Sequence, residues 1–376
     1  MKKTTIILVT ILSLIIFILS CSEERNKHHK SESLNNKIIK ENKSKNDNIA
    51  LYKTARYYSD IFKLKKIIDL QTTKESLIGR IESLILLKNR NRIIIFDSKS
   101  SKILLFDLNG KFINNIGKKG KGPGEFFKPG PITFGSNEII VYSKNGRILF
   151  YGLDGSFIKE INLRKNKWNF LANRMTTLGR DLYVYSRSKY YNIGLDGNRH
   201  MVFRISNFSD FDHSYGEPQE TILWGAGDIT TFKNKIIYTG IFNGKLYQIM
   251  PKNHKVVLFA NLGQLYDVSK AKESYNPIMY LVKHIKELDA IERIAVIKGM
   301  IFVYRTQANL SIIDSNGTII NKNIQYDINK PEGFEGNALR LACEFYDDGI
   351  ILASTKFEND KNGYFPNPSL IFYTLK

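Results

Sequence analysis

The chain has 376 residues, with 56 Lys and Arg against 36 Asp and Glu, and a formal net charge of +20. Its two cysteines, Cys21 and Cys343, are too few for a disulfide framework. The basic residues are spread along the whole chain instead of forming one stripe, so we expect no nucleic-acid partner despite the positive charge.

A secretory signal peptide is predicted for residues 1–20. Lys2 and Lys3 form a basic start, an uncharged apolar run follows over Thr4–Leu19, and a small residue, Ser20, precedes Cys21. The apolar run is shorter than the roughly 20 residues that a comfortable membrane span needs.

The segment Ile18-Leu19-Ser20-Cys21 resembles the lipobox of bacterial lipoproteins. The resemblance implies that Cys21 is acylated and holds an exported protein in the lipid bilayer, at the periplasmic face of the outer membrane or at the cell surface. Ser22-Glu23-Glu24 is similar to the surface-display tag of Bacteroidota lipoproteins. An uncleaved anchor, or a chance Cys after an ordinary signal, is the alternative. Residues 21–51 are mostly Lys, Asn, Ser and Glu, which predicts a disordered tether.

Residues Arg92–Leu163 contain the same strand pattern twice. Short apolar and aromatic runs are separated by Asn109-Gly110 in the first copy and by Asp154-Gly155 in the second, 45 residues later. Asn-Gly and Asp-Gly between such runs are strong hairpin signals, and this offset is typical of propeller blades.

Four further blades are predicted downstream. Blade three ends with His200–Ser206 as its outer strand after an Asp196-Gly197 hairpin, blade four turns at Pro251–His254, and blade five turns at Asn316-Gly317. Blade six ends with the chain and lacks one strand. We expect the run Ile61–Leu70 to pair with Leu370–Leu375 and so to close the ring.

Residues 52–376 are therefore predicted to form an all-β, six-bladed β-propeller with four antiparallel strands per blade. A different number of blades is the alternative, because the inner strands of blades four and five have a weak pattern.

The bridge between the first two blades, Ile116–Pro129, is similar to the G-x-G-x-G-P-G-E-F-x-x-P linker of NHL-type repeats. Such linkers also occur in six-bladed propeller lipoproteins of Bacteroidota. Most members of that group lack an assigned activity, so the resemblance implies a fold and leaves the ligand open.

The connections between blades are long and the hairpins on the opposite face are short, which favours the long-loop face around the central channel as the binding face. A helical insertion is predicted after Lys270, with Pro277 in its first turn, covering one side of the channel mouth. Aromatic and basic side chains in the long loops could hold a glycan or a peptide. Alternatively, the aromatic residues simply pack the loops onto the blades. The candidate rim residues are Lys118, Lys119, Lys121, Phe126, Arg164, Lys167, Trp168, Trp224 and Tyr364.

Enzyme signatures are mostly absent from the sequence, and no cofactor or metal is expected. The Gly-rich bridge lacks the Gly-Lys-Ser/Thr ending of a phosphate-binding loop. His213 and His284 both fall in predicted long loops and are weak catalytic candidates, since propeller lyases hold a metal with His near the channel.

The predicted function is that of a non-catalytic binding or scaffolding module for an extracellular ligand or an envelope partner protein. A carbohydrate-active or lyase-type enzyme with its site at the channel is the alternative from another class. A third hypothesis, binding of nucleic acid or another anionic polymer, would require the lysines to gather on one face. The oligomeric state is left open.

Overall fold

The computed structural model describes residues 49–163, 171–186, 200–216, 227–267, 269–284, 287–306, 309–328, 337–346, 348–355 and 366–376. The chain divides into two compact units, Met1–Thr54 and Ala55–Lys376, and the described strands all belong to the second unit.

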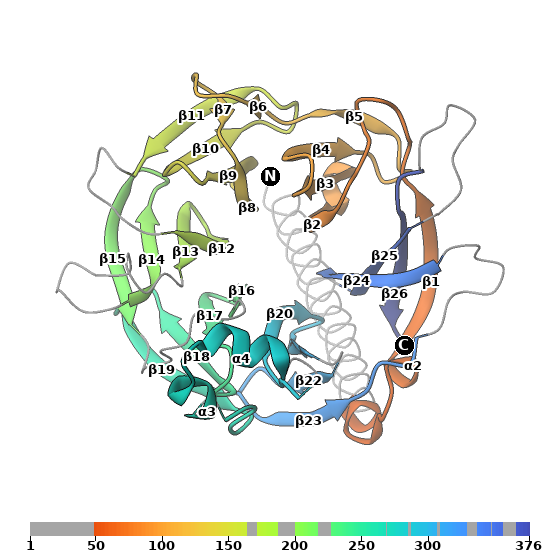
Figure 1. The fold of residues 1–376 in the computed structure, drawn as a ribbon, viewed down its shortest axis with the longest axis vertical. Helices are drawn as coiled ribbons and strands as arrows, with labels where there is room; N and C mark the ends of the chain where they lie inside the picture. Colours follow the sequence, from red (N-terminus) through yellow and green to blue (C-terminus); the bar gives the residue numbers. More distant parts are fainter. Residues whose placement is uncertain are drawn as a thin grey trace, which may run out of the picture. The chain divides into compact units, whose positions relative to one another are not determined.

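Six four-stranded antiparallel sheets form a ring in the second unit (Figure 1). Each sheet is one blade. One edge strand of each blade lies at the centre of the ring and is called its inner strand; below, each blade is given from its inner strand to its outer strand. The protein is therefore a six-bladed β-propeller, as the sequence predicts.

The first three blades lie between Ile81 and Gly216. Blade one consists of β2 (Ile81–Leu87), β3 (Arg92–Asp97), β4 (Lys102–Phe106) and β5 (Phe112–Asn115); blade two of β8 (Pro129–Gly135), β9 (Glu138–Ser143), β10 (Arg147–Tyr151) and β11 (Phe157–Asn162); and blade three of β12 (Ala172–Leu178), β13 (Asp181–Ser186), β14 (His200–Ser206) and β15 (Asp210–Gly216). A short 3-10 helix, η1 (Lys88–Arg90), follows β2, and a small parallel pair, β6 (Lys118–Lys119) and β7 (Glu125–Phe126), lies in the bridge.

The last three blades complete the ring. Blade four consists of β16 (Ile229–Phe232), β17 (Lys235–Thr239), β18 (Lys245–Met250) and β19 (Lys255–Asn261); blade five of β20 (Ile291–Ile297), β21 (Met300–Arg305), β22 (Leu310–Ile313) and β23 (Ile319–Ile324); and blade six of β24 (Asn337–Tyr346), β25 (Gly349–Thr355), β26 (Ser369–Leu375) and β1 (Phe62–Asp69). Helix α2 (Tyr58–Ile61) precedes β1, and α3 (Ser269–Glu273) and α4 (Pro277–Lys283) lie between blades four and five.

The middle strands of the blades carry buried apolar residues on both faces, because neighbouring blades cover both of these faces. In β3, Ile93 and Ile95 pack in a cluster with Leu370 of blade six, whereas Ile94 packs with Val141 of blade two. Side chains alternate between the two faces of a strand, so each face of the same run faces a different neighbouring blade.

The predicted hairpin at Asn109-Gly110 is confirmed. Gly110 has φ +83°, and the Asp107 carboxylate accepts hydrogen bonds from the backbone of Asn109 and Lys111. A Cβ at Gly110 would lie 2.1 Å from the carbonyl oxygen of Asp69 in β1. Glycine is therefore required both for the left-handed backbone and for the close contact between this turn and blade six.

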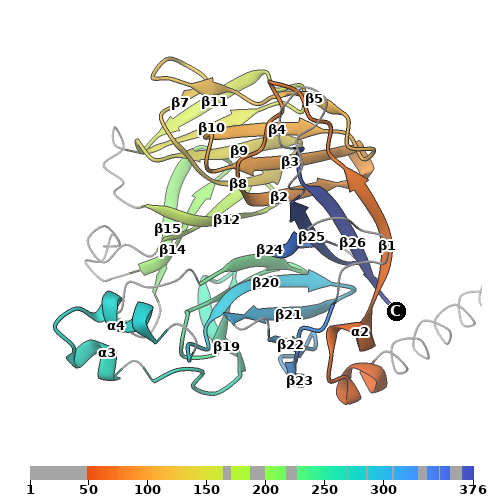
Figure 2. The same cartoon turned by 45° about the vertical axis from the view of Figure 1, so that its right-hand side comes forward.

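The predicted closure of the ring is also confirmed. Strand β1 pairs antiparallel with β26, from Phe62 opposite Leu375 to Asp69 opposite Ser369 (Figure 2). The backbone N–H of Lys376 donates to the carbonyl oxygen of Ile61 at 2.9 Å. The N-terminal end of the propeller thus supplies the outer strand of the last blade.

Blade three departs from the sequence prediction. His200–Ser206 is the third strand and not the outer one; the outer strand is Asp210–Gly216, and the two are joined by a tight turn in which Asn207 and Phe208 have positive φ. This turn has no glycine, so the sequence carried no hairpin signal there. The Asp196-Gly197 turn lies outside the described residues.

The predicted helical insertion is present, and α4 begins at Pro277 as expected. Ala271 and Leu281 pack on Ile241 and Phe242, in the turn between β17 and β18. The insertion therefore packs on the turn between the second and third strands of blade four. No residue of α3 or α4 is among the described residues that line the channel, so the expected cover of the mouth is not seen in this part of the chain.

Candidate functional site

The centre of the ring holds a channel with a volume of about 750 Å³. Its walls come from the inner strands β2, β8, β12, β16 and β20, together with the turns that follow the second strands of blades one and two. The side chains of the inner strand of blade six, β24, lie outside the described set.

One face of the ring holds the long connections. Strands within a blade are antiparallel and the chain enters each blade at its inner strand, so the connections between blades and the turns after the second strands lie on the same face. We call this the mouth face. It is the face that the sequence predicts for binding.

Charged residues gather where the channel opens on the mouth face. Each lies just before an inner strand, within its first three residues, or in a turn after a second strand. These channel-mouth residues are Arg80, Glu82, Lys128, Lys144, Arg174, Asp228 and Arg293.

β-Bulges shape the mouth ends of the inner strands. The pairing register shifts between Ile81 and Ser83 in blade one, between Ala172 and Arg174 in blade three, and between Ile291 and Arg293 in blade five. A bulge inserts an unpaired residue and redirects the neighbouring side chains. These bulges lie next to Glu82, Arg174 and Arg293, which line the channel.

Asp97 positions the backbone at Arg80. Its buried carboxylate accepts hydrogen bonds from the N–H groups of Gly79 and Arg80, at 2.8 Å each, and from the Ser100 hydroxyl. Burial alone would raise the pKa of Asp97, but the hydrogen bonds from Gly79, Ser100 and Arg80 lower it overall. Asp97 therefore stays ionised and fixes the turn from which Arg80 extends.

Asp228 links blades three, four and five at the mouth. Its carboxylate accepts a hydrogen bond from the backbone N–H of Ile294 at 2.9 Å and lies 3.5 Å from the Arg174 guanidinium. Asp228 is 5% exposed. The buried carboxylate of Asp228 therefore interacts with other residues of the protein and is not accessible to a ligand.

Hydrogen bonds tie the inner strands together toward the opposite end of the channel. The Thr177 hydroxyl donates to the carbonyl of Phe134 in blade two, and the Thr231 hydroxyl donates to the carbonyl of Thr177. The channel walls of blades two, three and four are therefore joined at this level.

The structure places the bridge candidates away from the channel, which corrects their expected position at its rim. Strands β6 and β7 lie at the periphery beside the outer strands β5 and β11 (Figure 1). Lys118 forms an ion pair with Glu125, and Phe126 is 1% exposed in the core between blades one and two. Lys119 and Lys121 belong to the same peripheral segment and do not appear among the described channel-lining residues.

Two internal hydrogen-bond donors explain why the bridge folds this way. The Arg147 guanidinium donates to the carbonyls of Gly122 and Glu125, and the Tyr151 hydroxyl donates to the carbonyl of Gly124 at 3.0 Å. The Gly-Pro-Gly-Glu-Phe segment is therefore held against blade two by its backbone, which is a structural role.

The other sequence candidates lie outside the described residues. They are Cys21, Arg164, Lys167, Trp168, Trp224 and Tyr364. Their places at the rim or the lipid anchor stay predictions.

The two histidine candidates are not brought together. His213 lies in β15, the outer strand of blade three, and not in a loop as predicted; its ring stacks on His254 with 3.5 Å between centroids. His284 lies at the end of the helical insertion, beside Tyr280 and Glu287. Neither is among the described channel-lining residues, and among the residues that the structure describes, no group of three or more His, Cys, Asp and Glu is arranged to hold a metal ion.

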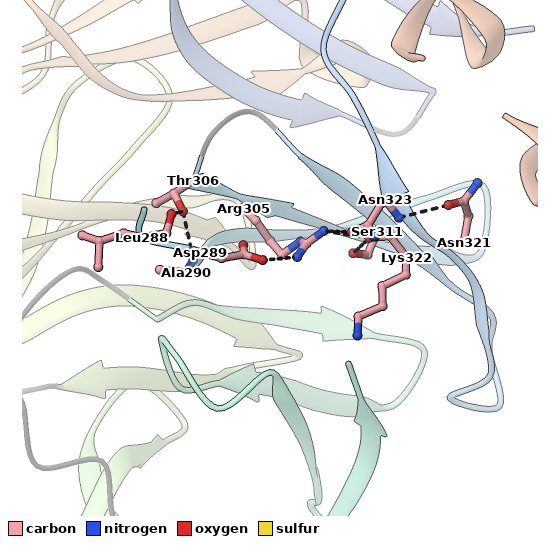
Figure 3. A network of polar contacts seen from close by, with 9 residues as sticks. All are labelled: Leu288, Asp289, Ala290, Arg305, Thr306, Ser311, Asn321, Lys322 and Asn323. Atoms are coloured by element: carbon pink, nitrogen blue, oxygen red, sulfur yellow. Dashed lines mark hydrogen bonds and ion pairs between the residues drawn. The ribbon is translucent and has the colours of Figure 1, made fainter. Parts of the chain in front are cut away.

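A buried polar network in blade five is structural and separate from the channel (Figure 3). The Arg305 guanidinium donates to the carboxylate of Asp289, to the carbonyl of Lys322 and to the side chain of Asn323. Arg305 is 2% exposed. The network joins the connection that enters blade five to its outer strand, β23.

The sequence did not single out the five basic channel-mouth residues. A signal was present, because they occupy equivalent places in successive blades, at the start of the inner strand or after the second strand. It could be found only after the blades had been correctly aligned with one another.

Comparison with known families finds a match over residues 47–287 to the family described as Domain of unknown function (DUF4934). No curated protein matches the chain. Within the described part of the chain, no helix combines the length and the apolar character needed to span a bilayer.

Solved structures share the propeller fold. A Bacteroides fragilis protein designated as exported is similar with a TM-score of 0.61 and 18% identity, covering 85% of this chain and 97% of its own. A member of the DUF4221 family from Bacteroides vulgatus is similar with a TM-score of 0.55 and 11% identity, covering 84% of this chain and 98% of its own. At these identities the likeness concerns the fold alone.

Proposed function

We propose, from the premise that the chain belongs to the DUF4934 family of domains of unknown function, that it is a non-catalytic binding or scaffolding module of the cell envelope. Its ligand is an extracellular glycan, a peptide or a partner protein, taken up at the channel mouth. The observation that carries this proposal is the channel of about 750 Å³, lined by five blades and polar at its mouth.

The channel has the dimensions of a ligand site. Small-molecule pockets typically enclose roughly 300–1,000 Å³. Strands form the walls of the channel and provide a rigid scaffold. The long connections beside the mouth can vary in sequence between related proteins without disturbing the blades. This division between scaffold and loops is how binding sites are usually built on propellers and similar folds.

Export and lipid anchoring are part of the proposal. The signal-like residues 1–20 and the lipobox-like segment ending at Cys21 support them, and one structural relative is designated as exported. We expect the wild-type protein to fractionate with the membrane and Cys21→Ser to be lost from it. Equal membrane retention of both proteins would contradict the lipid anchor.

The similarity of the bridge Ile116–Pro129 to NHL-type linkers also stays a prediction.

The experiment is a binding screen of the purified protein against glycans, peptides and envelope polymers, followed by calorimetry on any hit. Thr230 lines the channel, so Thr230→Trp should obstruct it and weaken binding at least tenfold. Thr318→Trp, on the exposed hairpin turn of blade five, is the matched control and should bind as the wild type does. Trp168→Ala and Trp224→Ala test the predicted aromatic rim.

Two results would contradict the proposal. If Thr230→Trp, shown to be folded by circular dichroism, binds as tightly as Thr318→Trp, the ligand is not in the channel. If mass spectrometry finds that the bound ligand is cleaved or otherwise converted, the protein is an enzyme and the non-catalytic assignment fails.

A further inference from the structure

We infer that the channel mouth is built for an acidic oligosaccharide, one that carries carboxylate or sulfate groups. The inference rests on the proposed function, since it names the class of ligand for the same site. It is carried by the charge balance of the mouth, by one pair of neighbouring lysines, and by the polar side chains of the wall.

The charge balance of the mouth favours anions. Five basic residues and two acidic residues are found among the described residues that line the channel. Both acids already have basic neighbours, because Glu82 lies 3.4 Å from Arg80 and Asp228 lies 3.5 Å from Arg174. Within the described residues Lys128 and Lys144 form no ion pair, so these two lysines supply positive charge that the two acids do not balance.

Lys128 and Lys144 are adjacent to each other. The backbone N–H of Lys144 donates to the carbonyl of Lys128 at 2.9 Å, immediately beyond the paired residues Pro129 and Ser143. Both lysines are exposed, and within the described part of the chain neither forms an ion pair. Like charges on neighbouring strands repel each other, so an anion bound between the two ammonium groups would relieve this repulsion.

Arginines from blades three and five also line the mouth. Arg174 and Arg293 follow the β-bulges of blades three and five, and the Arg293 guanidinium reaches the carbonyl of Glu82 in blade one at 3.5 Å. A guanidinium presents a planar fork of N–H donors that suits carboxylate and sulfate oxygens. The mouth can thus contact more than one anionic group of a single ligand.

The wall of the channel favours a carbohydrate over an acidic peptide. Hydroxyl and amide side chains lie among the charged residues, and they both donate and accept hydrogen bonds, as sugar hydroxyls do. These residues are Ser83, Ser98, Thr133, Asn173 and Thr230.

The test is calorimetric titration of the purified protein with four probes of similar length. They are a galacturonic acid hexamer, a sulfated hexasaccharide, a neutral galactose hexamer and hexaglutamate. We expect at least one of the acidic saccharides to bind, the neutral one to bind at least tenfold more weakly, and binding to weaken at least tenfold between low and high salt because screening reduces the attraction.

The double variant Lys128→Ala/Lys144→Ala should weaken binding of the acidic saccharide at least tenfold. Lys111→Ala/Lys252→Ala removes the same charge from exposed hairpin turns away from the channel, and should leave affinity within twofold of wild type. Equal losses in both double variants would mean that only the overall charge matters, which would overturn the assignment to the mouth.

The remaining outcomes separate this inference from the proposed function. If the neutral hexamer binds as tightly as the acidic ones, the anion preference is wrong while the binding function stands. If hexaglutamate binds tighter than both acidic saccharides, the carbohydrate assignment is wrong. If neither acidic saccharide binds, the inference is overturned, and the wider screen then decides the proposed function by itself.

Discussion

Two groups of basic residues in this protein have different environments. Arg147, Arg204 and Arg305 are largely buried and each contacts carboxylates or carbonyls of its own blade, as Arg204 does with Asp181 at 2.8 Å. Removing one partner of a buried charge pair leaves an uncompensated charge, so we expect replacement of these arginines to destabilise the fold. The channel-mouth lysines are exposed and are available to a ligand.

His254 is the residue whose protonation we expect to influence stability. Its ring stacks on His213, and its Nδ1 lies 2.9 Å from the Tyr215 hydroxyl. Burial, followed by the nearby His213 and Arg204, lowers the pKa of His254 from the ordinary value of 6.5, while Asp212 opposes this shift. The folded protein therefore favours the neutral imidazole.

This shift predicts a loss of stability on acidification. Below pH 6.5 the unfolded chain takes up a proton at His254 more readily than the folded chain does, so acid favours unfolding. The contribution is complete above pH 6.5 and is lost as the pH falls through the lowered pKa. Urea unfolding between pH 7.5 and about pH 5 should show this decline, and His254→Asn should make it shallower.

Asparagine is the suitable replacement because His254 has φ +55°, a conformation that Asn tolerates well. His284→Asn, in the separate helical insertion, also removes one histidine but leaves the stacked pair intact, and is the control. A His254→Asn variant with an unchanged pH dependence would show that the stacked pair does not govern stability in this range.

At the level of elements, β1 is the strand whose contribution is easiest to isolate. Ile68 is 6% exposed and packs with Leu370 and Phe372, whereas Leu64 on the same strand is 47% exposed. We expect Ile68→Ala to lower the free energy of unfolding by about 2–5 kcal/mol, because it leaves a cavity in the contact between blades. Denaturant unfolding measures this cost.

Leu64→Ala provides the matched control. An exposed truncation on the same strand should change the free energy of unfolding by no more than about 0.5 kcal/mol. Equal costs at the two positions would mean that β1 does not pack between blade one and the other strands of blade six as described.

For the molecule as a whole, closure of the ring by β1 protects an edge. Without β1, strand β26 would expose unpaired backbone groups along Ser369–Leu375, and such edges promote association between chains. A chain that starts at residue 71 should therefore self-associate in light scattering, whereas one that starts at residue 49 should not. A monomeric, cooperatively folded chain lacking β1 would contradict the need for closure.

Local patterns in the sequence were sufficient to predict most of the fold. The turns at Asn109-Gly110 and Asp154-Gly155 revealed the repeat, and the unpaired run at the start of the propeller revealed how the ring closes. The prediction was wrong in blade three, where Asn207 and Phe208 form the tight turn without a glycine. It was also wrong for Phe126, because aromatic character alone does not distinguish a rim residue from a core residue.

The sequence by itself determined the number of blades, the closing strand and the face that carries the long connections, because strand periodicity and turn residues act over a few neighbouring positions. Only the tertiary structure decided what surrounds the channel. Lys128, Arg174 and Arg293 are far apart in the chain, and they meet at one mouth because the ring brings the starts of the inner strands together. β-Bulges next to Arg174 and Arg293 redirect the side chains of the strand ends there.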